Sequence, residues 1–152
     1  MVYTDPMTTL ITLLNTITIT PESITSISKN VSIGNVNATL RGGVGGEITP
    51  QFTVMKQAAP TRAMDGAGAT STVEFNYIVS CWNQTYGPTE NSAKLNEKMV
   101  KAVRDLIKTN RKNPSGTIRY LEVINEIQRD EADITPIIRR TMIFVRAVCL
   151  RE

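Results

Sequence analysis

The sequence contains no histidine, and this absence has the widest consequence for function. Imidazole is the commonest general base in enzymes, the commonest metal ligand, and the base of the serine and cysteine triads. Catalysis by this chain would have to depend on carboxylates or lysines instead. We therefore expect a protein that is not an enzyme, with no catalytic residues, no metal site and no cofactor.

Cysteine is also scarce, and the two residues present, Cys81 and Cys149, both fall in predicted strands. We interpret them as small buried hydrophobes, with a cross-strand disulfide or a reactive thiol as the alternatives. No apolar run approaches the roughly 20 residues that span a bilayer, and the N-terminus lacks the basic-then-apolar order of a signal peptide. We expect a soluble protein made in a cytoplasm, with no membrane partner.

The charge balance is mild, with 17 basic and 14 acidic residues and a net charge of +3 in 152 residues. This length is ordinary for one domain, so residues 1–152 are predicted to form a single domain. The basic residues are not gathered into a block, and a nucleic-acid footprint is not indicated. One dense acidic group lacks the D-x-D-x-D-G spacing of a calcium loop, and an exposed turn and strand edge is the favoured interpretation; its members are Glu122, Glu126, Asp130, Glu131 and Asp133.

Residues 72–112 organise the chain as a strand followed by a long helix. Apolar side chains alternate from Val73 to Cys81, which is the period of a half-buried β-strand. From Thr89, the expected N-cap, to Lys112 the period changes to three and four residues, which predicts an amphipathic helix. Its apolar stripe consists of Leu95, Met99, Ala102, Val103 and Leu106.

Shorter patterns predict the remaining elements. Asp5 and Pro6 open a helix over about residues 5–16, one or two short strands are expected within 23–40, and residues 51–57 form another strand. Residues 117–128 would also make a helical stripe, but their β-branched start favours a strand. Residues 135–150 are the richest β-run. We interpret the arginines within it as a solvated or interface-facing edge, and they are Arg139, Arg140, Arg146 and Arg151.

Two segments are predicted to be flexible loops, at 41–47 and 58–71. The first is rich in glycine, but it lacks the lysine and hydroxyl of a P-loop and no helix follows it, so a plain loop is favoured over a phosphate site. The second joins two strands and consists mostly of small residues. A loop of this length inside a compact domain is usually functional or disordered. We favour an arm that orders against a partner over an active-site lid.

These elements predict an α+β fold, with a mostly antiparallel sheet and an N-terminal helix and one long amphipathic helix packed on it. Three features together resemble the ring-forming tail terminator, tail-completion and neck proteins of tailed viruses. They are the alternating strand at 73–82, the Pro88-Thr89-Glu90 entry into the helix at 93–112, and the closing strand pair at 117–128 and 137–150 with Arg139 or Arg140 near its middle. The resemblance covers about the last 100 residues by pattern.

The resemblance implies a virion structural protein, assembled in the host cytoplasm, whose copies form a ring that is typically hexameric. Such a ring sits at the head-proximal end of a tail, ends tube polymerisation and joins tail to neck. Its partners would be further copies, the tail-tube protein and neck or connector proteins, with genomic DNA only passing through the lumen. Under this hypothesis the subunit contacts include residues of the arm and of the last strand, namely Pro60, Arg62, Met64, Asp65, Gly66, Gly68, Arg139 and Arg140.

Other interpretations of the sequence remain open. A tail-tube or head–tail connector subunit, or another oligomeric scaffold, would share the same elements and would be recognised by long polymers in place of closed rings. An enzyme would need the acidic group between residues 122 and 133. A nucleic-acid module is less favoured, because aromatic and basic residues are not interleaved and Trp82 is the single tryptophan.

Overall fold

The computed structural model describes residues 6–17, 31–33, 50–57, 62–63, 72–84, 89–112, 118–131 and 137–150. Within these residues the chain forms two helices and six strands. In chain order they are α1 (Pro6–Leu14), β1 (Val31–Ile33), β2 (Gln51–Lys56), β3 (Arg62–Ala63), β4 (Thr72–Asn83), α2 (Thr89–Thr109), β5 (Ile118–Gln128) and β6 (Arg139–Leu150).

The strands form one sheet in the order β1-β2-β4-β6-β5, and β3 pairs with the start of β4. All pairings are antiparallel except that of β1 with β2, which is parallel. The central pair is β4 and β6, which are joined along their whole length from Thr72 opposite Leu150 to Asn83 opposite Arg139. The predicted α+β fold with a mostly antiparallel sheet is confirmed.

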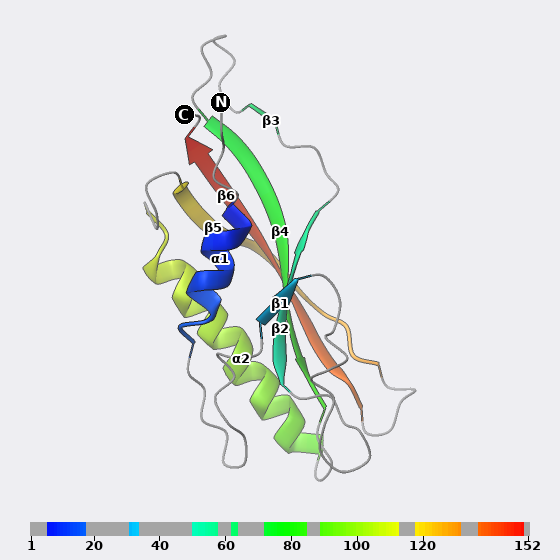
Figure 1. The fold of residues 1–152 in the computed structure, drawn as a ribbon. Helices are drawn as coiled ribbons and strands as arrows, with labels where there is room; N and C mark the ends of the chain where they lie inside the picture. The colour runs from blue at the N-terminus through cyan, green and yellow to red at the C-terminus, as the bar shows by residue number, and fades with distance from the viewer. Residues whose placement is uncertain are drawn as a thin grey trace.

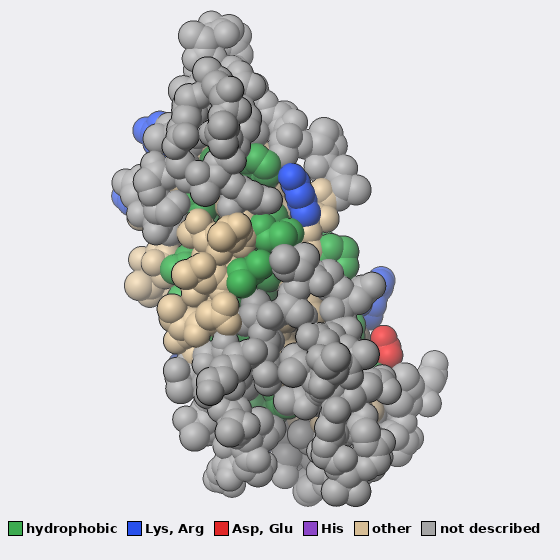
Figure 2. All heavy atoms as spheres, viewed as in Figure 1, with side chains coloured by type: hydrophobic (Ala, Val, Ile, Leu, Met, Phe, Trp, Pro, Cys, Tyr) green, Lys and Arg blue, Asp and Glu red, His purple; other side chains and the backbone are tan. Residues whose placement is uncertain are grey.

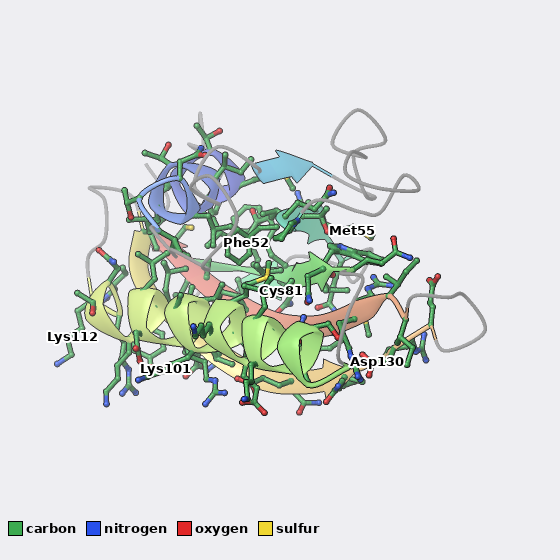
Figure 3. All side chains as sticks on the ribbon, turned by 90° about the horizontal axis from the view of Figure 1, so that it is seen from below. Phe52, Met55, Cys81, Lys101, Lys112 and Asp130 are labelled. Carbon is green, nitrogen blue, oxygen red and sulfur yellow. The ribbon has the colours of Figure 1, made fainter. Side chains whose placement is uncertain are left out.

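Both helices pack on the same face of the sheet, and the core lies between them and the strands (Figure 1). The core-facing set predicted for β4 is confirmed, since Phe75, Tyr77, Val79 and Cys81 are all buried on this face, but the strand is more than half-buried because Ser80 and Trp82 on the other face are buried too. Each fully buried side chain of this size contributes about 1.5–3 kcal/mol of transfer free energy. In Figure 3, Phe52 and Cys81 lie between the two helices.

The stripe of α2 is wider than the sequence pattern indicates. Leu95, Met99 and Val103 are buried as predicted, whereas Ala102 and Leu106 are only partly buried. Two further side chains, Val100 and Ile107, complete the buried surface. The buried side of the helix is therefore rotated relative to the predicted stripe, toward Val100 and Ile107 and away from Ala102 and Leu106.

The edge interpretation of the last strand is wrong. β6 lies between β4 and β5, so its arginines belong to an interior strand. A run of β-forming residues shows that a strand exists, but its neighbours depend on pairings far along the chain. The strand also begins at Arg139, later than predicted, and Ile138 before it forms only an isolated bridge with Glu131.

Several sequence predictions fall on segments that the structure covers only in part. The loop at 41–47 lies outside the described residues, as do residues 58–61 and 64–71. Within the second loop, Arg62 and Ala63 form β3 opposite Glu74 and Val73. The described part of 23–40 contains one strand, β1. Neither α1 nor α2, the helices in the described ranges, has the length and apolarity to cross a membrane.

Candidate assembly surfaces

The sheet face that points away from the helices carries a band of apolar side chains. Cross-strand register places Ile78 of β4 beside Met55 of β2 and Phe144 of β6, and Met142 of β6 beside Ile127 of β5. Met142 is nearly buried, Met55, Ile78 and Phe144 are half-buried, and Ile127 is 40% exposed. Neither described helix covers this band, which we call the far-face band.

The outermost strand, β5, has two unlike halves. Its first half lies under α2, with Ile118 and Leu121 buried. A backbone hydrogen bond of 2.8 Å from the Leu121 amide to the Arg111 carbonyl also covers its outer side. Its second half is exposed, and Ile124 and Ile127 are the large hydrophobic residues that stand out there, at 54% and 40% exposure.

A bulge marks the transition between these halves. The register with β6 shifts between Val123 and Asn125, which leaves Ile124 as the extra residue. Among the described residues, no strand pairs with the outer side of β5 from Glu122 to Gln128. Edge strands with free N–H and C=O groups can add a strand from another chain, and a bulge limits that pairing to part of the edge. We call this stretch the open edge.

A buried polar network fixes the N-terminal half of α2 to the end of the sheet. The Asn96 side-chain amide donates to the Cys81 carbonyl at 3.1 Å and to Asn83 Oδ1 at 2.9 Å, and its own oxygen accepts from the Thr141 hydroxyl at 2.5 Å. The Asn83 amide in turn donates to the Ser92 carbonyl at 2.9 Å. Buried amides satisfied in this way fix the position of one element relative to another.

Sequence reasoning missed this network, although one signal was available. The apolar stripe predicted for the helix does not include Asn96, and the alternation predicted for the strand ends before Asn83. Asn96 occupies a position one turn from Ser92 and from Met99 and Val100, on the side of α2 that faces the sheet. A polar residue inside an apolar stripe indicates that a partner must lie opposite it.

The two arginines predicted to contact other subunits are both engaged within the chain. Arg139 Nη1 forms an ion pair of 2.7 Å with Asp130, and Arg139 Nε donates to the Ser92 hydroxyl at 3.3 Å. The Arg140 guanidinium lies 4.3 Å from the centre of the Trp82 ring. Burial, and after it the charge of Arg129, lower the pKa of Arg140. A subunit-contact role for either arginine stays a prediction.

The other predicted contact residues are described only in part. Pro60, Met64, Asp65, Gly66 and Gly68 lie outside the described residues. Arg62 is part of β3, opposite Glu74 in the register. The register thus places Arg62 near the start of β4, whereas Arg139 and Arg140 lie opposite its end, and the role of all the predicted contact residues stays a prediction.

The acidic group is largely paired with arginines. Glu122 pairs with Arg146, Glu126 with Arg104 at 2.7 Å, and Asp130 with Arg139. Glu131 is exposed, and Asp133 lies outside the described residues. Within the described part of the chain, no three histidine, cysteine or acidic side chains come together as a metal site would require.

Both cysteines are buried and neither forms a disulfide, which confirms their interpretation as small buried hydrophobes. Burial raises the pKa of the Cys81 thiol well above its usual range, and the nearby charge of Glu126 adds to the effect. A thiol in this environment stays protonated and is a poor nucleophile.

Comparison with known proteins gives similarity among solved structures only. No protein-family profile matches the sequence, and no curated protein matches it. Among solved structures, the chain is similar to a chain described as "Virion of native gene transfer agent (GTA) particle". The TM-score is 0.47 at 14% sequence identity, and the match covers 82% of this chain and 81% of that chain.

Proposed function

We propose that this chain is a non-enzymatic virion structural protein that forms a ring at the head-proximal end of a viral tail. In this role the ring ends tube polymerisation and joins the tail to the neck. The support is the resemblance of residues 73–82, 93–112, 117–128 and 137–150 to tail terminator and neck proteins, together with the surface of β5.

The observation that carries the proposal is the pair of exposed isoleucines on the open edge. Ile124 and Ile127 lie beside backbone groups that no described strand pairs, and Ile127 continues directly into the far-face band through Met142. The Glu126 amide is the donor on this edge that already has a local partner, Asn125 Oδ1 at 2.8 Å. Exposed apolar side chains on an edge that no described strand pairs suit strand addition by a second polypeptide. We propose that a neighbouring copy of the chain supplies it.

A closed ring is one of the two assemblies that a contact between opposite edges of the sheet can produce. The open edge of β5 lies at one side of the sheet and β1 at the other. A contact between unlike surfaces of successive copies is heterologous, and it produces a closed ring when the rotation between copies closes. The hexamer expected from the resemblance would correspond to one such closure.

The alternative is a tail-tube or head–tail connector subunit, and the same open edge favours it. A heterologous contact whose rotation does not close gives an open helical polymer in place of a ring. Stacked rings or long tubes of the purified protein would therefore transfer the proposal to a tube subunit.

The test is the native mass of the purified chain across a concentration series, combined with electron-microscope class averages. The wild-type chain is expected to form closed rings of one size. The double variant Ile124→Lys/Ile127→Lys should remain monomeric, because two lysines on the open edge repel a neighbouring strand and remove its apolar contact. Rings that still form in this variant would remove β5 from the interface.

A matched control is available on α1. Thr8 and Thr12 are exposed and lie one turn apart on its outer side, so Thr8→Lys/Thr12→Lys adds the same two charges away from β5. This control should assemble like the wild type. If it also fails to assemble, added charge and not the open edge accounts for the loss, and the proposal loses its main support.

A further inference from the structure

The outer side of α2 carries a row of exposed lysines. Lys94, Lys98, Lys101 and Lys108 follow one another at steps of four, three and seven residues, which keeps them on one side of a helix. This side is opposite the buried Met99 and the rest of the core-facing surface. We call these four residues the lysine row.

The row is long and straight. From Lys94 to Lys108 it covers 15 residues of α2, and the 14 steps of 1.5 Å between them give about 21 Å. Lys112 lies just beyond the end of the helix and is also exposed, so it extends the row. Lys101 and Lys112 mark the middle and the far end of this surface in Figure 3.

The charge of the row is not neutralised by its surroundings. Within the described residues, no lysine of the row lies within ion-pair distance of a carboxylate. Glu97 and Asp105 are exposed acidic residues on the same side of the helix, set against four lysines, so the row keeps a net positive charge. The arginine at the flank of α2 behaves differently, because Arg104 pairs with Glu126.

Helix stability accounts for only part of the row, because Lys101 alone has acidic residues at i−4 and i+4, namely Glu97 and Asp105. Lysines at i and i+4, such as Lys94 and Lys98, repel each other and cost an isolated helix about 0.2–0.5 kcal/mol per pair. The core-facing side chains already hold α2 on the sheet. A row of like charges along a rigid helix instead provides an extended binding surface for a polyanion.

We propose that the lysine row binds the phosphate backbone of double-stranded nucleic acid, independently of base sequence. Lysine ammoniums act as point charges that suit phosphate oxygens, whereas base reading favours the arginine fork. No aromatic residue lies between Lys94 and Lys112, so the row lacks the stacking platforms that bind single strands. A duplex carries one charge per about 1.7 Å, which supplies phosphates along the whole row.

In the described part of a second copy, the exposed acidic residues Glu97 and Asp105 lie among the lysines of α2, and Glu131 is a single side chain. Glu122, Glu126 and Asp130 are each held in an ion pair with an arginine of the same chain. Breaking such pairs to meet the lysine row would exchange one ion pair for another with no net gain. The row also lies on a different element from Ile124 and Ile127 of β5, so the proposal stands independently of ring formation.

The experiment measures binding of a short fluorescent DNA duplex to the full chain by anisotropy across a sodium chloride series. The row variant is Lys98→Gln/Lys101→Gln/Lys108→Gln. The control variant is Lys56→Gln/Arg119→Gln/Arg129→Gln, whose three residues are exposed and lie outside the row. Each variant lowers the net charge from +3 by three, to zero.

The wild type should bind with a steep dependence of log K on log salt concentration. The row variant should lower the magnitude of this slope by about 3, because each phosphate contact contributes about 0.9. The control variant should keep most of the slope. Equal losses in both variants, or an unchanged slope in the row variant, would overturn the proposal.

Two further measurements separate the competing explanations. Poly-glutamate that competes as well as the duplex at equal charge would assign the row to an acidic protein and overturn the nucleic-acid assignment. Native mass is recorded for each variant, so failure of ring assembly and failure of DNA binding are observed separately. Circular dichroism of the row variant should match the wild type, since all three lysines are exposed.

Discussion

The two helices pack on the same face of the sheet but present very different outer surfaces. α1 contains no charged residue, and no blue or red side chain lies over it in Figure 2. Thr8 and Thr12 are its exposed residues. α2 exposes the lysine row along most of its length. Both nevertheless contribute fully buried side chains to one core. Packing thus determines only the inner side of each helix, and the outer side is free to serve another purpose.

The largest expected effect on the free energy of unfolding comes from substitutions on the core-facing sides of α1 and α2, and it tests whether the two sides contribute equally. Leu14 of α1 and Met99 of α2 are both 0% exposed and belong to the same core cluster. Substitution of either by alanine should lower the free energy of unfolding by about 2–5 kcal/mol, through lost burial and the cavity left behind. Urea denaturation of Leu14→Ala and Met99→Ala measures both losses.

The outcome also decides whether α1 folds together with the rest. If Leu14→Ala costs less than about 1 kcal/mol while Met99→Ala costs the expected amount, α1 opens independently of the core. A similar loss in both variants, with an unchanged denaturant slope, would establish that the two helices share one cooperative unit.

A smaller loss of stability is expected from a feature of α2. α2 alone is fixed by a buried amide, because Asn96 joins Cys81, Asn83 and Thr141. Asn96→Ala should cost about 1–3 kcal/mol, since it leaves buried partners without hydrogen bonds. The control is Asn110→Ala, which removes only a local bond to the Leu106 carbonyl. A cost no greater than that of the control would show that the network contributes nothing to stability.

The sequence predicts the individual elements well where a single period continues for a long stretch. The alternation from Val73 to Cys81 predicts β4, which forms the centre of the sheet, and the three- and four-residue steps predict α2 almost to its ends. The β-branched start of residues 117–128 correctly favours a strand, β5, over a helix. Each of these predictions depends on short-range spacing, which the sequence displays directly.

The arrangement of the elements could not be predicted in the same way. Neither the parallel pairing of β1 with β2 nor the position of β6 between β4 and β5 has a local signature. The placement of Arg139 beside Asp130 and of Arg140 over Trp82 follows from that strand order. The exposure of Ile124 likewise depends on a bulge, which appears only once β5 is paired with β6.

The smallest expected effect concerns the outer sides of the helices. Lys98→Gln/Lys101→Gln/Lys108→Gln should change the free energy of unfolding by less than about 0.5 kcal/mol, because exposed substitutions away from the core are usually near neutral. The change should stay small at low salt as well, because the variant removes repulsion between neighbouring lysines together with the attraction of Lys101 to Glu97 and Asp105. Urea denaturation at low and high salt measures both the size and the sign.

A stability loss above about 1 kcal/mol would contradict this expectation, since it would mean that the lysine stems cover apolar surface of α2. A change in the free energy of unfolding close to zero would instead show that the two sides of the helix have different functions. Met99 would then be needed for folding and not for binding, and Lys101 for binding and not for folding. That division would explain how α2 can carry a row of like charges for which its own helical stability accounts only in part.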